Sequence, residues 1–141
     1  MDDQPGLSDQ YRMSSPWPVF VALGLVLSEL GVLFGIIPLS VGGLLLFAGS
    51  TAGILTESGY TSDLWRVMGG IGAVLVVLGA ILTGTQLGLS APSAIVSELI
   101  AAFGGQPNGI IIRGVSIVAA GVITIGVGAI APFVQSDIET P

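Results

Sequence analysis

Four long apolar stretches, separated by short polar or proline-containing connections, dominate the chain. We expect them to form helices over residues 16–37, 39–56, 64–86 and 110–134, because about 20 apolar residues are enough for a helix to cross the hydrocarbon core of a bilayer. Pro38 interrupts the first apolar run, so the first two helices are predicted to form an antiparallel hairpin with its turn around residues 38–40. A single bent helix over both runs is disfavoured, since it would overshoot one bilayer. Strands are disfavoured because membrane-barrel strands alternate apolar and polar residues.

A shorter helix is predicted in the connection before the last long helix, over residues 92–103. Its apolar residues Ile95, Leu99 and Ala102 recur at helical spacing, as in a helix that lies at a membrane surface. Pro132 is expected to close the last long helix. Residues 1–15 and 135–141 are predicted to be acidic tails. The pattern therefore predicts an all-α membrane protein, a four-transmembrane-helix bundle with a short interfacial helix before the last span.

Composition supports a membrane environment. Of 141 residues, 52% are hydrophobic and 9% are charged, compared with about 25% charged in a typical soluble domain. So few charged residues do not cover the surface of a small soluble protein, and a lipid bilayer is the expected solvent. The net charge of −6 argues against nucleic acid as a partner.

Cysteine and histidine are both absent from the chain. This excludes disulfides, thiolate or imidazole metal ligands, cysteine nucleophiles and imidazole bases. We therefore expect no catalytic residue, no cofactor-binding residue, no metal site and no enzymatic activity. An unidentified membrane enzyme is disfavoured, because polar catalytic groups must converge in one place.

Small residues recur on the predicted helices, as they do where membrane helices approach one another closely. They are predicted to form a helix-packing or partner interface at Gly24, Ser28, Gly31 and Gly35 of the first helix and at Gly49 and Gly53 of the second. Packing within the bundle and docking to another subunit are both consistent with this pattern. Trp17 and Trp65, near the starts of two helices, are predicted to be interface anchors.

Glu29 lies within the first apolar helix, where a charge is costly and deserves a functional hypothesis. We expect Glu29 and Arg113 to be buried ionisable residues, because Arg113 enters the last helix from the same side of the membrane. Three alternatives stay open. In the first, Glu29 is bonded within the protein, either as an ion pair with Arg113 or, when neutral, to Ser28 or Thr51. In the second, it contacts a polar group of a partner subunit. In the third, it takes part in a proton path.

The three basic residues are all arginines, and the chain contains no lysine. Arg12 and Arg66 lie on the side of the termini and Arg113 on the other, so the positive-inside rule places both termini of this multi-pass cell-membrane protein in the cytoplasm. Acidic, lysine-free polar segments are typical of a high-salt cytoplasm, where ions screen the repulsion between carboxylates.

Several segments resemble a known family. The sequence DQPGLSDQYR at residues 3–12 and SPWP at 15–18, with VGGLLLFAGS at 41–50 and AGILTESGY at 52–60, are similar to small haloarchaeal membrane proteins of the cox gene cluster. Their genes lie beside those of the haem-copper terminal oxidase. The resemblance implies a non-catalytic accessory subunit or assembly partner of a respiratory oxidase of the cytochrome c or quinol type, and it supplies no catalytic residues. The alternative is a small oligomeric transporter or channel with Glu29 in an ion path.

Overall fold

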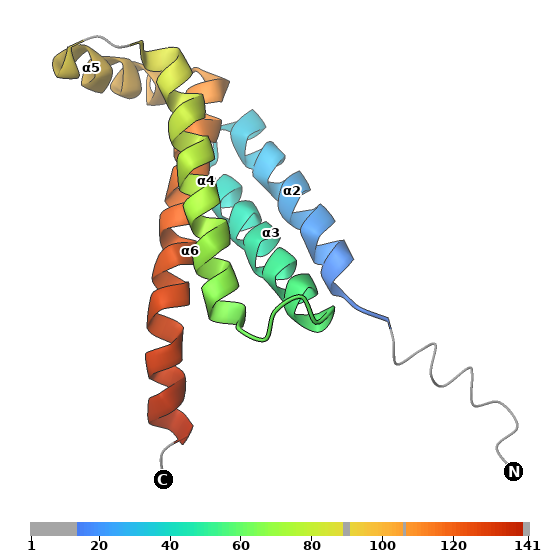
Figure 1. The fold of residues 1–141 in the computed structure, drawn as a ribbon. Helices are drawn as coiled ribbons and strands as arrows, with labels where there is room; N and C mark the ends of the chain where they lie inside the picture. The colour runs from blue at the N-terminus through green and yellow to red at the C-terminus, as the bar shows by residue number, and fades with distance from the viewer. Residues whose placement is uncertain (1–13, 89–90, 106, 140–141) are drawn as a thin grey trace, which may run out of the picture.

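The computed structural model describes residues 14–88, 91–105 and 107–139, and this part of the chain is all-helical (Figure 1). It contains no strand, and its helices are α2 (Trp17–Phe34), α3 (Ile37–Glu57), α4 (Leu64–Leu87), α5 (Pro92–Phe103) and α6 (Gly109–Glu139). Within the described residues, α2, α3, α4 and α6 are each long and apolar enough to cross a membrane. The predicted all-helical fold is confirmed.

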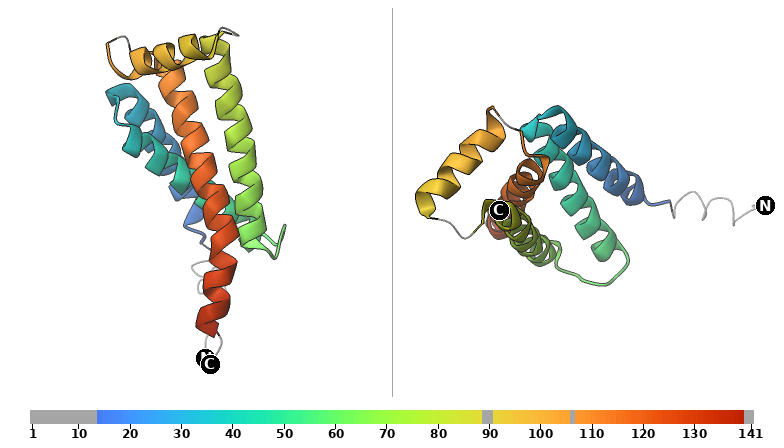
Figure 2. Two further views of the ribbon diagram at one scale, coloured as in Figure 1. Left: turned by 90° about the vertical axis from the view of Figure 1, so that its left-hand side faces the viewer. Right: turned by 90° about the horizontal axis from the view of Figure 1, so that it is seen from above.

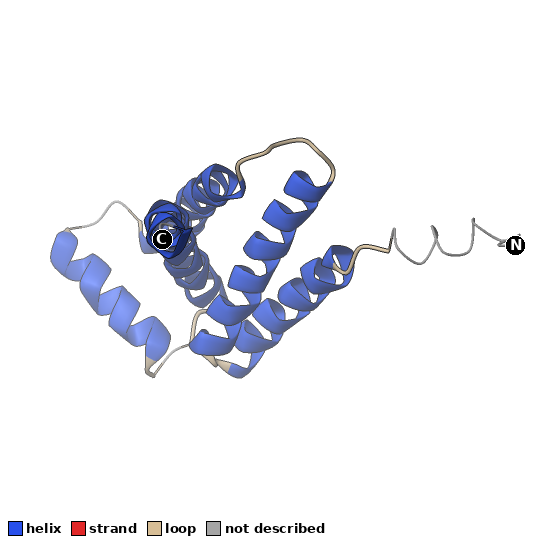
Figure 3. Ribbon diagram, turned by 90° about the horizontal axis from the view of Figure 1, so that it is seen from below, coloured by secondary structure: helices blue, strands red, loops and turns tan. Residues whose placement is uncertain are grey.

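The helices form two antiparallel pairs. Helix α2 packs on α3 and α4 packs on α6, while α3 joins the pairs through contacts with both α4 and α6. Helix α5 lies across the end of the bundle at which α4 ends and α6 begins, as Figure 2 shows. The start of α2, the α3–α4 loop and the end of α6 lie at the opposite end (Figure 1). Helix α2 touches α6 only slightly and therefore forms an edge of the bundle, as the view along the bundle in Figure 3 also shows.

The turn between α2 and α3 is made by Gly35, earlier than the prediction placed it. Gly35 has a left-handed backbone conformation with φ of 68°, and the N–H groups of Gly35 and Ile36 donate to the carbonyls of Val32 and Gly31 at 3.2 and 2.7 Å. This hydrogen-bond pattern ends a helix. Pro38 instead occupies the first turn of α3, where the missing N–H of a proline costs little. Gly35 is thus a turn residue, and a Cβ added to it would meet nothing within 4 Å.

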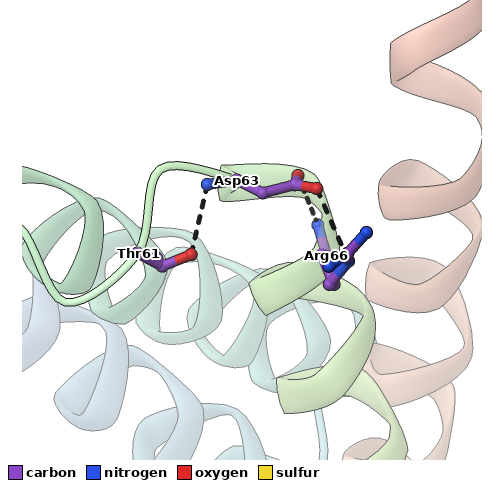
Figure 4. A network of polar contacts seen from close by, with 3 residues as sticks. All are labelled: Thr61, Asp63 and Arg66. Carbon is purple, nitrogen blue, oxygen red and sulfur yellow. Dashed lines mark hydrogen bonds and ion pairs between the residues drawn. The ribbon is translucent and has the colours of Figure 1, made fainter.

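Asp63 fixes the start of α4 at the predicted residue. Its Oδ1 accepts a hydrogen bond from the backbone N–H of Arg66 at 3.0 Å, and its Oδ2 lies 3.6 Å from the Nε of Arg66 (Figure 4). The Oγ1 of Thr61 accepts from the backbone N–H of Asp63 at 3.1 Å. A carboxylate at this position satisfies an otherwise unpaired N–H and complements the helix dipole.

Helix α6 continues to Glu139, beyond the predicted end at residue 134. Pro132 lies inside it, although a proline removes one helical hydrogen bond. Contacts with α4 on both sides of the proline hold the two segments in line: Gly128 lies against the backbone of Trp65, and the Nε1 of Trp65 donates to the Oε1 of Gln135 at 2.8 Å. Residues 135–139 of the predicted C-terminal tail are therefore helical. Residues 1–13 of the predicted N-terminal tail lie outside the described residues, as do residues 140–141.

Glycines bring the helix backbones into direct contact in both pairs. A Cβ at Gly24 of α2 would lie 2.6 Å from the carbonyl oxygen of Gly43, and a Cβ at Gly72 of α4 would lie 2.7 Å from that of Gly121. Two buried hydroxyls of α6 pair within their own helix, since the Oγ of Ser116 and the Oγ1 of Thr124 donate to carbonyls four residues earlier, each at 2.7 Å. The bundle is therefore held together by close backbone packing rather than by large interlocking side chains.

Candidate functional site

The charged pair predicted from the sequence is present in the structure. The guanidinium of Arg113, one turn into α6, faces the carboxylate of Glu29 on α2. Its Nε donates to the Oε1 of Glu29 at 3.2 Å and its Nη2 donates to Oε2. Two parallel hydrogen bonds between a guanidinium and a carboxylate form a geometrically specific, charge-assisted contact. This pair joins α2 to α6, two helices that otherwise touch little.

The pair is less buried than we expected. The side chain of Glu29 is 59% exposed and that of Arg113 is 38% exposed, because α2 lies at the edge of the bundle and leaves this face uncovered. Thr51, an alternative partner for Glu29, donates to the carbonyl of Phe47 in its own helix at 2.7 Å. Among the three alternatives for Glu29, the structure places its carboxylate in the ion pair and leaves part of it accessible from outside the bundle.

A groove runs between α2 and the start of α6, and the ion pair lies in its wall. Its volume is about 860 Å³. Apart from Glu29 and Arg113, its lining is apolar or glycine, including Leu25, Val26 and Leu33 of α2 and Gly109 at the first turn of α6. The arrangement therefore combines a mainly apolar channel with one pair of opposite charges.

The predicted small-residue interface has three different structural roles. Gly24, Ser28 and Gly31 are buried on α2, where Gly24 and Gly31 lie against the backbone of α3. Gly53 lies under the indole of Trp17, 2.8 Å from where its Cβ would be. Gly49 has open space around it and Gly35 forms the turn. Most of these small residues thus pack within the α2–α3 hairpin.

Both tryptophans lie at the end of the bundle that carries the α3–α4 loop, at the starts of α2 and α4. The ring of Trp17 packs on Gly53 and meets that of Phe20 edge-on, with centroids 6.2 Å apart. Trp65 binds Gln135. Their position suits the predicted role of interface anchor, and both also tie helices together.

Sequence reasoning missed one exposed surface, on α4. Four of its five members are glycine or alanine and the fifth is Val77; they are spaced three and four positions apart, and each is exposed. We call this surface the α4 flank, formed by Gly70, Ala73, Val77, Ala80 and Gly84. A Cβ at Gly70 or Gly84 would meet nothing within 4 Å. The spacing of these residues was the available signal, but the same helix also carries Gly72, Gly79 and Thr83, which face α6, and sequence alone does not tell the two sets apart.

The strength of the Glu29–Arg113 pair is testable by a double-mutant cycle. We expect Glu29→Gln and Arg113→Gln each to lower the free energy of unfolding in detergent, with a coupling of about 1 kcal/mol, at the upper end for exposed pairs because of the bidentate geometry. The pair Asp63 and Arg66, within one turn at the start of α4, is the control and should couple more weakly. Additive effects of the two Gln substitutions at 29 and 113 would show that the contact contributes nothing.

The described residues contain no group of three or more histidine, cysteine, aspartate or glutamate side chains that is able to hold a metal ion. The fold defines the class, a helical protein with four helices of membrane-spanning length and a surface ion pair near one end. The chain belongs to a family of unknown function, DUF7541, whose profile matches residues 1–134. No curated protein and no solved structure matches the chain.

Proposed function

We propose that the protein is a multi-pass membrane protein with both termini in the cytoplasm, and that it is a non-catalytic accessory subunit or assembly partner of a respiratory haem-copper oxidase. Helix α2, with 18 residues, is about 27 Å long at 1.5 Å per residue, close to the ~30 Å of a hydrocarbon core. The outer faces carry large apolar side chains, such as Leu33 at 74% and Phe133 at 72% exposed. Lipid is the solvent that suits such a surface.

Helix α5 supports this placement at the membrane boundary. Ile95, Leu99 and Ala102 pack against α4 and α6 around Leu87 and Ile111. A second apolar row next to this face, formed by Val96, Ile100 and Phe103, is exposed. A helix that lies across the end of a bundle with such a row uncovered is suited to the interfacial region of a bilayer.

The α4 flank is the observation that carries the accessory role. Small residues at alternating spacings of three and four form the seam of left-handed helix pairs, in which two backbones approach closely. Inside this protein, glycines already serve that purpose between α4 and α6, whereas the flank has no helix against it in the described structure. A transmembrane helix of another subunit is its natural complement. The oxidase as partner rests on the resemblance of residues 3–60 to the cox cluster family.

Substitutions on the α4 flank test this interface. Gly70→Leu and Gly84→Leu should leave the thermal stability of the isolated protein unchanged, because a side chain there enters open space. They should reduce the amount of oxidase retained with the tagged protein at least tenfold, because a leucine keeps the partner backbone away. Gly42→Leu, at an exposed glycine of α3 with equally open space, is the matched control. Full retention of oxidase by both flank variants would show that the α4 flank is not the surface that binds the oxidase.

The second candidate is a small oligomeric transporter or channel in which Glu29 lines an ion path. The partial exposure of this carboxylate in the groove favours it. The bidentate contact with Arg113 weighs against it, since the guanidinium occupies the oxygens that would carry the proton. Proton or ion flux into liposomes containing the pure protein, lost on Glu29→Gln, would support this second candidate over the first.

A further inference from the structure

The Glu29–Arg113 pair lies within the proposed membrane span but close to its edge. Glu29 precedes the end of α2 by five residues and Arg113 follows the start of α6 by four, which places both about 6–8 Å inside the helix ends. Charged side chains exposed to hydrocarbon are unfavourable even when they are paired. A group that covers the pair and offers polar contacts would therefore be stabilised at this position.

Arg113 retains hydrogen-bonding capacity that the protein does not use. A guanidinium has five N–H donors and no acceptor. Glu29 accepts from two of them, one on Nη2 and one on Nε, and no other side chain or carbonyl of the described residues accepts from Arg113. Three donors are thus left at the wall of the groove, next to the first turn of α6 at Gly109. The N–H groups of Ile110 and Ile111 in that turn already donate to the Oδ1 of Asn108 at 3.0 and 3.3 Å, so the guanidinium is the donor available to an anionic group there.

The rest of the groove is suited to a hydrocarbon chain. Below the ion pair, toward the middle of the bundle, it is walled by Leu25 and Val26, which are 47% and 55% exposed. Its volume of about 860 Å³ falls in the range of roughly 300–1,000 Å³ typical of small-molecule sites. A phospholipid matches both parts of the groove: its phosphate suits the N–H donors of Arg113 at the membrane edge, and its hydrocarbon chain suits the apolar wall toward the middle of the bundle.

The geometry points to a phospholipid-binding site in this groove, in which the phosphodiester accepts hydrogen bonds from the free N–H groups of Arg113 and one hydrocarbon chain lies along Leu25 and Val26. Glu29 is a positioning residue that holds the guanidinium in the wall of the groove. The inference rests on the membrane placement proposed above but not on the oxidase as partner. With a net charge of −6, the chain offers no long-range attraction to anions, so the local contact with the phosphodiester provides the recognition.

The test uses the purified, delipidated full-length protein in mild detergent. Phosphatidylglycerol and phosphatidylcholine are titrated in, with diacylglycerol of the same chains and inorganic phosphate as comparisons, and binding is followed by native mass spectrometry and thermal unfolding. We expect one phospholipid per chain and a rise in Tm with both phospholipids. Diacylglycerol and inorganic phosphate should each bind at least tenfold more weakly.

Variants separate the head site from the chain site. Arg113→Gln, and Glu29→Gln with Arg113→Gln as an uncharged pair, should each weaken phospholipid binding about tenfold or more. Val26→Trp should weaken it by filling the chain site, and it keeps the proposal testable if the arginine variants do not fold. Val74→Trp, at a 57% exposed position of α4 outside the groove, should bind as the unaltered protein does.

Three results would overturn the proposal. The first is diacylglycerol binding as tightly as phospholipid, which would make the groove purely apolar. The second is unchanged phospholipid binding in both Val26→Trp and the uncharged pair. The third is a stable dimer without lipid that Val26→Trp dissociates, which would show that a second copy of the chain covers the groove. If the protein binds phospholipid but does not associate with the oxidase, only the proposal of the oxidase as partner is contradicted.

Discussion

Replacing Gly79 with leucine is expected to disrupt the packing of α4 on α6 and to lower the free energy of unfolding by about 3 kcal/mol, at the upper end for overpacked positions. A Cβ at this position would lie 2.6 Å from the carbonyl oxygen of Gly114 and 2.7 Å from the backbone nitrogen of Val118. Backbone atoms do not rotate away as the end of a flexible side chain does, so the two helices must separate. Unfolding by denaturant in mild detergent measures the loss.

Gly84→Leu is the matched control on the same helix. It introduces the same side chain five residues later, where a Cβ meets nothing within 4 Å, and leucine has a higher helix propensity than glycine. The stability of the isolated protein should therefore be unchanged or slightly higher. Equal losses from Gly79→Leu and Gly84→Leu would contradict the α4–α6 packing described here.

Replacing Gly31 with leucine is expected to have a comparable effect on the α2–α3 hairpin. The new Cβ would overlap the backbone nitrogen of Ser40 and lie 2.6 Å from its Cα, and the hairpin turn at Gly35, four residues beyond Gly31, leaves the helices no room to separate. We expect α2 to detach, with a loss of about 3 kcal/mol in the free energy of unfolding and faster hydrogen–deuterium exchange over α2 than over α4 and α6.

Gly42→Leu is the control for that substitution, since Gly42 lies on the same hairpin in open space. Its exchange rates over α2 should match those of the unaltered protein. An unchanged hydrogen–deuterium exchange rate over α2 in Gly31→Leu would contradict the close packing of α2 on α3 at this residue.

Much of the fold follows from local sequence patterns. Hydropathy located all four long helices, and the spacing of Ile95, Leu99 and Ala102 identified α5, although the packing of this face on the bundle was not predicted. The pairing of Glu29 with Arg113 followed from the hairpin topology, because it places both residues near the same end. These features depend on the spacing of apolar residues and on the alternating direction of successive helices, and both follow from the sequence.

The differences arise where tertiary contacts override a local preference. Pro38 was expected to end a helix, but Gly35 ends α2 first and leaves Pro38 in the first turn of the next helix. Pro132 was expected to close α6, but contacts with Trp65 hold the helix on both sides of it. The exposure of Glu29 depends on which helices α2 contacts, and hydropathy alone does not specify that arrangement.

The α4 flank shows why small residues alone did not identify the partner surface. Gly72 and Gly79 of α4 face α6, whereas Gly70 and Gly84 of the same helix face outward. All four are glycines in one apolar run, and only the three-dimensional packing separates the used face from the open one. Leucine at Gly79 is therefore expected to lower the stability of the isolated protein, whereas leucine at Gly70 or Gly84 is expected to reduce its association with a partner.

The most direct test of the proposed function is purification of the tagged protein from its native membrane in a gentle detergent, with a visible spectrum of the eluate and identification of the co-eluting chains. We expect haem absorbance together with subunits of a haem-copper oxidase, in a fixed ratio that the Gly70→Leu and Gly84→Leu variants lose. A colourless protein that elutes alone, while the oxidase stays intact in the same membranes, would contradict the proposed function.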